Sequence, residues 1–169
     1  MNKKSGFTLA EVLVTLMIIG VIAAMTIPSL MQSTAQQEFR AAYKKAVSML
    51  NQAVTLNYAL DGRDASDYTG SGFFNLMTQR LNVLSTSGTT LYTADGMFFS
   101  PSGGAACNAN NGSDASNKCA DVTVDVNGQK GPNKITTATN NVFDIFTIAI
   151  YPQKALPGND TMSKILYQK

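Results

Sequence analysis

The feature that most constrains this chain is an uncharged apolar run near its N-terminus, at residues 12–27. Only Thr15, Gly20 and Thr26 interrupt its otherwise apolar side chains. A helix needs roughly 20 apolar residues to cross a bilayer, and the run reaches about this length when it is counted from Phe7. We therefore predict a membrane-spanning helix.

An acidic residue, Glu11, lies inside this extended apolar segment. A carboxylate at the centre of a membrane helix costs about 2.5 to 3.5 kcal/mol, and less near the end of the helix. Such a residue usually marks a functional contact, whereas the simpler interpretation is a side chain solvated among the lipid headgroups. The basic leader before it contains Lys3 and Lys4 and ends at Gly6. A secretory signal is cut after its apolar region, but a cut after Gly6 would leave the apolar run in place.

Residues 3–30, KKSGFTLAEVLVTLMIIGVIAAMTIPSL, resemble the N-terminus of the type IV pilin and type II secretion pseudopilin superfamily. The resemblance implies that a prepilin peptidase cuts after Gly6 and methylates the new N-terminal residue, Phe7. It also implies that Glu11 is the assembly residue and that Pro28 kinks the helix. The implied partners are copies of the chain, other pilin-like subunits, the peptidase and an inner-membrane assembly platform.

The new ammonium group at Phe7 would lie in the same apolar layer as Glu11 of a neighbouring subunit. Pairing the two charges removes the cost of burying either one alone, which is several kcal/mol per ion, and fixes the register between helices. The predicted function is therefore a pilin-like structural subunit of a type IV pilus or a type II secretion pseudopilus, with a DNA-uptake pilus left open. The alternative is a monomeric periplasmic binding domain on a single uncleaved membrane anchor, which needs no Glu11.

The charge pattern predicts location and argues against two function classes. Lys3 and Lys4 place the N-terminus in the cytoplasm by the positive-inside tendency. We expect a single-pass inner-membrane protein with a periplasmic head, which becomes part of a periplasmic or extracellular filament. Without those lysines, 11 basic side chains balance 11 acidic ones, so nucleic-acid binding is not expected. The chain has no histidine to activate a Ser or Cys nucleophile, and we predict no enzyme.

After the apolar run, residues 29–60 predict an amphipathic continuation of the helix. Pro28 lacks the amide hydrogen of the helical ladder, so we expect a bend there and not an end. A helix from Phe7 to Leu60 would be roughly 80 Å long, too long for a 169-residue globule, so its first half must protrude. A mostly apolar stripe recurs at steps of three and four, and its residues are Phe39, Tyr43, Ala46, Val47, Leu50, Ala53, Val54 and Asn57.

Residues 61–169 predict a globular head. A turn-rich break at residues 61–72 ends the long helix, and apolar spacing predicts a connecting helix at about 73–84. The remainder, from about 89 to 151, contains strand and turn patterns. The predicted fold class is α+β and pilin-like, with the long helix packed on a small antiparallel sheet of about four strands.

The strand predictions rest on turn pairs and on alternation. Asp95-Gly96 divides one β-rich segment and predicts a hairpin. A second strong turn pair, Asn127-Gly128, follows a segment in which valines alternate with polar residues. The three segments expected to form the sheet are residues 89–99, 121–126 and 141–151.

The only two cysteines, Cys107 and Cys119, flank a polar loop that cannot form a core. Because the chain has no histidine, four zinc ligands are hard to assemble. Export to an oxidising compartment would allow a disulfide. A bridge across about 13 residues contributes up to roughly 3 kcal/mol in the chain-entropy model, and we predict this bridge.

A loop after residues 121–126 offers oxygen atoms of the kind that calcium binds, from Asp125, Asn127, Asn133 and Asp144. The resemblance to major pseudopilins, which have a calcium loop in their C-terminal region, supports that interpretation. However, the segment lacks the later Glu of an EF-hand, and Asx-Gly pairs are commoner as plain turns. We therefore predict a structural turn and no cofactor, with calcium as the alternative.

Overall fold

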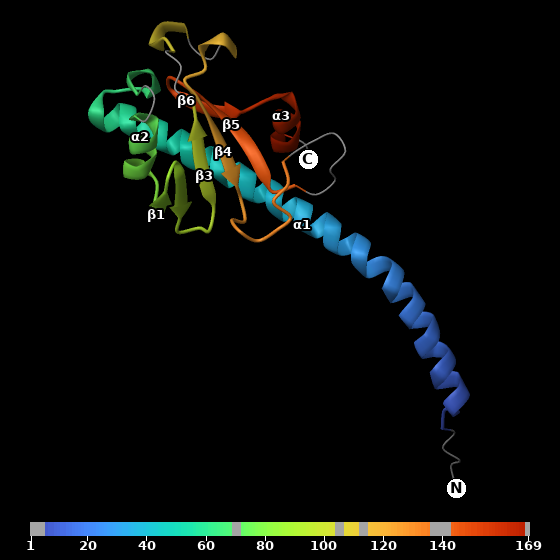
Figure 1. Cartoon of the computed structure of the whole chain (residues 1–169). Coiled ribbons are helices and arrows are strands. Elements are labelled where there is room, and N and C mark those ends of the chain that lie inside the picture. Colours follow the sequence, from blue (N-terminus) through green and yellow to red (C-terminus); the bar gives the residue numbers. More distant parts are fainter. Residues whose placement is uncertain (1–5, 69–71, 104–106, 112–114, 136–142, 168–169) are drawn as a thin grey trace.

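The structure is a computed structural model that describes residues 6–68, 72–103, 107–111, 115–135 and 143–167. Its longest element is helix α1, Leu9–Asp61, of 53 residues. Figure 1 shows the C-terminal half of α1 against a head of strands and short helices, while the N-terminal half projects away from the head. The predicted α+β class and the protruding first half of the helix are confirmed.

Helix α1 is continuous through Pro28. Its protruding half curves gradually in Figure 1, and a kink at Pro28 stays a prediction. The helix ends at Gly62, whose φ of 65° suits a residue without a Cβ atom and whose N–H donates to the Tyr58 carbonyl at 3.0 Å. This end lies in the predicted turn-rich break.

The sheet has six antiparallel strands in sequence order, and the prediction of about four strands is wrong. The two missed strands are the edges, β1 and β6. β1 is exposed over most of its length and β6 has only four residues, so neither carried a period-two signal. The strands are β1 (Val83–Ser87), β2 (Thr90–Thr93), β3 (Phe98–Ser102), β4 (Ala120–Asp125), β5 (Ile145–Tyr151) and β6 (Lys154–Pro157).

The central strands follow the sequence patterns. β2 and β3 form the predicted hairpin, with Gly96 at a φ of 79° in its turn. In β4, Val122 and Val124 face the core as their alternation predicts. Residues 141 and 142 of the third predicted segment lie outside the described residues, and β5 begins at Ile145.

The short helices differ from the predictions at their boundaries. Helix α2 spans Gly72–Arg80, so the expected helix at 73–84 is too long by its last four residues. Leu81 and Asn82 connect the helix to the sheet, and Val83 already pairs with Thr93 of β2. Helix α3, Asp160–Tyr167, was not predicted. Three 3₁₀ turns complete the described elements, namely η1 (Ala65–Asp67), η2 (Ala109–Asn111) and η3 (Ala115–Asn117).

The core lies between α1 and one face of the sheet. Tyr43 stacks on Phe146 with ring centroids 4.4 Å apart, and its hydroxyl donates to the Thr147 carbonyl at 3.2 Å. Asn51 holds the outer edge of β6, because its side chain donates to the Ala155 carbonyl and accepts from the Ala155 N–H, both at 2.8 Å. The buried residues of α1 are Tyr43, Ala46, Val47, Leu50, Ala53, Val54 and Asn57.

Candidate processing and assembly site

The peptide bond predicted to be cut lies just before α1 begins. Gly6 and Phe7 precede the helix and are exposed, with 90% of Phe7 accessible. A Cβ atom placed on Gly6 would meet no other atom within 4 Å. The Gly6–Phe7 bond is therefore open to a protease that acts on an extended segment.

Thr8 caps α1, and sequence analysis missed this role. The Thr8 hydroxyl accepts from the Glu11 N–H at 3.3 Å. The Glu11 Oε2 atom in turn accepts from the Thr8 N–H at 2.8 Å and from the Thr8 hydroxyl at 2.9 Å. This is a capping box, and the Thr-x-x-Glu spacing was the signal that could have revealed it. Glu11 is therefore bonded within its own chain, and it is exposed to any partner that approaches.

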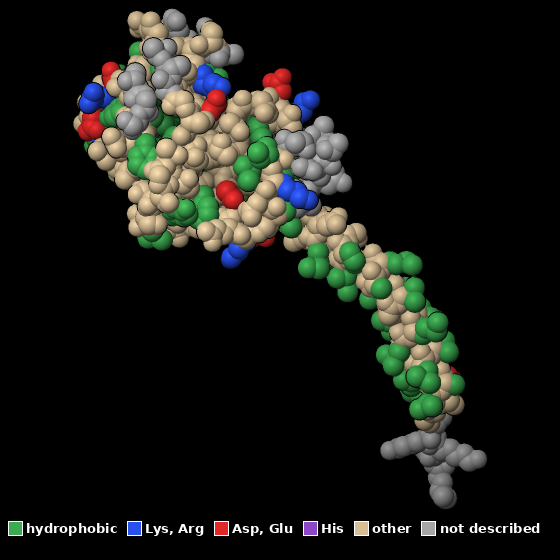
Figure 2. Space-filling model, in the orientation of Figure 1, with side chains coloured by type: hydrophobic (Ala, Val, Ile, Leu, Met, Phe, Trp, Pro, Cys, Tyr) green, Lys and Arg blue, Asp and Glu red, His purple; other side chains and the backbone are tan. Residues whose placement is uncertain are grey.

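The protruding half of α1 presents apolar side chains on all sides. Between Val12 and Ile27, the large apolar side chains are 45 to 75% exposed. Figure 2 shows them covering the visible face of the rod without Lys or Arg side chains, whereas charged side chains are scattered over the head. We call residues 9–30 the apolar rod. Of the described helices, α1 alone is long and apolar enough to cross a membrane, judged by length and composition.

The three hydroxyl side chains of the apolar rod bond to its own backbone. The Thr15 hydroxyl donates to the Val12 carbonyl at 2.9 Å, and the Thr26 hydroxyl donates to the Ile22 carbonyl at 3.0 Å. Ser29 donates to the Thr26 carbonyl in the same way. These bonds satisfy the hydroxyl donors without water, as a lipid or protein environment requires.

Comparison with known families identifies this N-terminal segment. Residues 1–27 match the family model described as the prokaryotic N-terminal methylation motif. The chain carries a prepilin-type leader. This finding confirms the resemblance to type IV pilins and pseudopilins for the leader and for most of the apolar rod, and it indicates a pilin-like precursor. No curated protein and no solved structure matched the chain.

The structure brings together the four residues considered for calcium. Asp144 is fully buried, and its carboxylate accepts the backbone N–H groups of Asn133 and Lys134 at 2.8 and 2.7 Å. The Asn133 amide, oriented to satisfy its neighbours, donates to Asp125 Oδ2 at 3.2 Å. The Asn127 N–H donates to the other oxygen of Asp125 at 3.2 Å. The described residues contain no group of three or more His, Cys, Asp or Glu side chains placed to hold a metal ion.

Asp125 has an unusual acidity in this loop. Its partial burial raises the pKa of its carboxyl to about 6, and the nearby Asp144 carboxylate also raises this pKa, while N–H groups of Asn127 and Gly128 oppose the shift. The Asp125 carboxyl is therefore half protonated near pH 6.

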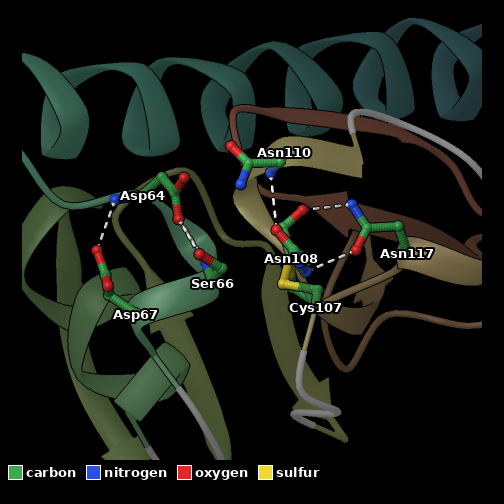
Figure 3. Close-up of a disulfide and its surroundings, with 8 residues drawn as sticks. Asp64, Ser66, Asp67, Cys107, Asn108, Asn110 and Asn117 are labelled. Atoms are coloured by element: carbon green, nitrogen blue, oxygen red, sulfur yellow. Dashed lines mark hydrogen bonds between the residues drawn. A yellow bond between two sulfur atoms is a disulfide. The ribbon is translucent and has the colours of Figure 1, made fainter.

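The two cysteines form a disulfide in the structure, with their Cα atoms 4.9 Å apart (Figure 3). Cys119 is buried. Asn108 and Asn117 join the two sides of the loop beside the bridge. The Asn108 N–H donates to Asn117 Oδ1 at 2.6 Å, and Asn117 Nδ2 donates to the Asn108 carbonyl at 2.8 Å. The bridge and these bonds hold the two ends of the polar loop together.

Proposed function

We propose that this chain is a pilin-like structural subunit that a prepilin peptidase cuts after Gly6 and methylates at Phe7. The mature subunit would assemble into a type IV pilus or a type II secretion pseudopilus. The observation that carries the proposal is the methylation motif of residues 1–27, which continues directly into an apolar rod exposed on all sides. In this proposal residues 1–6 are the leader, 7–28 the membrane and filament-core segment, 29–60 the amphipathic half helix and 61–169 the head.

Two environments would cover the apolar rod in turn. Before assembly the rod would span the inner membrane, with the head in the periplasm, as the leader lysines and the disulfide favour. During assembly the rods of other copies, or of other pilin-like subunits, would replace lipid around each rod. An inner-membrane assembly platform would drive this transfer, and the subunit itself would perform no catalysis.

Glu11 would fix the register of the rods. In the isolated chain its carboxylate takes both of its close hydrogen bonds from Thr8. The Phe7 ammonium group of a neighbouring subunit is the partner that cleavage would create in the same apolar layer. A charged pair there avoids the several kcal/mol that either ion would cost if buried alone.

The test separates the charge of Glu11 from its capping role. Gln can replace Glu in a capping box, so Glu11→Gln keeps the cap and removes the charge. Thr8→Ala is the matched control, because it removes the cap and keeps the charge. We expect Glu11→Gln to lower filament incorporation at least about tenfold, which corresponds to about 1.4 kcal/mol, and Thr8→Ala to have a smaller effect. Sheared filaments and membrane fractions would be quantified by immunoblot, and normal incorporation of Glu11→Gln would refute the pairing mechanism.

Cleavage after Gly6 and methylation of Phe7 are tested by a separate measurement. Intact-mass and N-terminal peptide analysis of the chain, expressed with a prepilin peptidase, should find a methylated Phe7 as the first residue. Retention of Met1 would instead support a monomeric periplasmic domain on an uncleaved anchor, whatever the result for Glu11.

The proposal includes no metal. Both carboxylate oxygens of Asp144 accept backbone N–H groups, and Asp125 accepts hydrogen bonds on both of its oxygens. A calcium ion would have to replace these bonds, which already close the loop.

A further inference from the structure

Strand β1 is the open edge of the sheet. At the opposite edge, the backbone N–H and carbonyl of Ala155 in β6 are both bonded to Asn51 of α1. β1 has no such cover. Apart from its ladder with β2 and a bond from the Val83 N–H to the Leu81 carbonyl, it makes no hydrogen bond within the part of the chain that the structure describes. Its outward N–H and carbonyl groups are therefore available to another strand.

The open edge also lacks most of the features that usually protect such strands. Residues 81–94, which contain β1 and β2, include no charged residue and no proline, although edges are commonly guarded by lysine or proline. The charges that flank this segment are already paired, since Arg80 forms an ion pair with Asp61 and Asp95 lies 3.1 Å from Lys45. An incoming strand would therefore meet a neutral edge.

Most side chains of β1 are exposed. Four of its five residues are exposed and Val83 is half-buried. The ladder with β2 shifts register between Val83 and Ser85, and Leu84 at this irregularity is 72% exposed. From Ser85 to Ser87 the pairing is regular. The edge thus offers three hydroxyl side chains beside one unpartnered apolar side chain.

We propose that β1 is a docking edge for an extended, uncharged segment of a different polypeptide, which joins the sheet as a seventh strand. Main-chain hydrogen bonds would supply the affinity, as in other cases of strand addition. Thr and Ser residues of the incoming segment suit positions opposite Ser85 to Ser87, and one apolar residue suits Leu84. A charged residue would find no counter-ion there.

The geometry disfavours a second copy of this chain as the partner. Two-fold pairing of β1 with β1 of another copy is antiparallel, and its axis is perpendicular to the sheet. Helix α1 runs across one face of the sheet (Figure 1). A two-fold rotation about an axis perpendicular to the sheet would therefore point the two apolar rods in opposite directions. Rods that share one membrane or one polar filament must point the same way. Head-to-tail pairing of β1 with β6 is blocked by Asn51.

Peptide binding to the full chain in detergent micelles tests this proposal. The probe is a fluorescent, end-capped peptide with the sequence of residues 89–94, TTLYTA, because β2 shows which sequence pairs with β1. In an extended peptide, successive N–H groups point to opposite edges. Two control peptides therefore carry N-methyl groups on alternate amides, and each of the two peptides has a different edge blocked. We expect one methylated peptide to bind at least about tenfold more weakly than the probe, and the other to bind equally well. Hydrogen exchange should slow in residues 83–87 of the protein when the probe binds.

A protein variant gives a second readout. Thr86→Pro removes an amide hydrogen from β1 and should weaken probe binding, while unfolding of the variant monitors whether the head remains intact. Four results would overturn the proposal: no binding below about 1 mM, equal binding of the probe and both methylated peptides, slowed exchange outside β1, or sedimentation showing a dimer that the probe dissociates. None of these measurements involves cleavage or filament assembly, so they stand apart from the proposed function.

Discussion

The two halves of α1 differ in how their apolar side chains are distributed. In the C-terminal half these side chains form one stripe, and the sheet buries it. In the N-terminal half they surround the helix, and nothing in the described part of the chain covers them. A helix that is apolar on one face folds against its own domain, whereas a helix that is apolar all round needs an external environment on every side. One continuous element therefore serves both the fold of the head and contacts outside it.

The largest expected effect contrasts the same substitution in the two halves. Leu50→Ala in the buried stripe should lower the free energy of unfolding of the head by about 2 to 5 kcal/mol, because it leaves a cavity in the core. Leu16→Ala in the apolar rod should change this free energy by less than about 0.5 kcal/mol. Urea titration in detergent micelles, followed by tyrosine fluorescence, measures the difference, since all six tyrosines lie at or beyond residue 43. Equal losses for both variants would refute the division of α1 into independent halves.

A smaller effect is expected from the disulfide, which belongs to the head alone. Replacing Cys107 and Cys119 together by Ser should lower the free energy of unfolding by up to about 3 kcal/mol and leave membrane insertion unchanged. Reductant should destabilise the wild-type protein by the same amount and have no effect on the variant. Two titratable thiols in denatured, unreduced protein would show that the bridge is absent.

The smallest expected effect is the pH dependence due to Asp125. Its folded pKa of about 6 lies above the ordinary value of 3.8, so the folded state binds more protons than the unfolded state between these values. The contribution of Asp125 to stability is therefore present below about pH 4 and is lost as the pH rises through 6. Asp125→Asn should be more stable than the wild type at pH 7.5, and the two should converge near pH 4.

Thermal unfolding at a series of pH values measures this convergence. A pH-independent difference between Asp125→Asn and the wild type would contradict the raised pKa. Calcium chloride at pH 7.5 provides a further control, because stabilisation of the wild type alone would show that the loop binds the cation and would correct the metal-free interpretation.

Sequence reasoning worked best where the signal is local and periodic. The apolar run, the stripe from Tyr43 to Val54 and the alternation in β4 each repeat over several residues. The turn pair Asp95-Gly96 also identifies its hairpin, because glycine tolerates the φ of 79° found there.

The missed elements lack such local signals. β1 is exposed over most of its length, and four-residue β6 depends on bonds from Asn51, which is 104 residues away from Ala155 in the sequence. Helix α3 has only eight residues, and its N-terminus is held by a hydrogen bond from the Met162 N–H to Asn159 Oδ1 at 2.9 Å. Elements this short are stabilised mainly by their tertiary contacts.

The sequence by itself determined the prepilin-type leader, the apolar rod, the amphipathic continuation and the α+β class, because composition and helical period act over neighbouring residues. Only the tertiary structure decided the number of strands, the closure of one sheet edge by Asn51 and the exposure of the other at β1. It also partly buried Asp125 and placed it near Asp144, and both effects raise the pKa of Asp125. These properties depend on distances between residues far apart in the chain, and no local pattern encodes those distances.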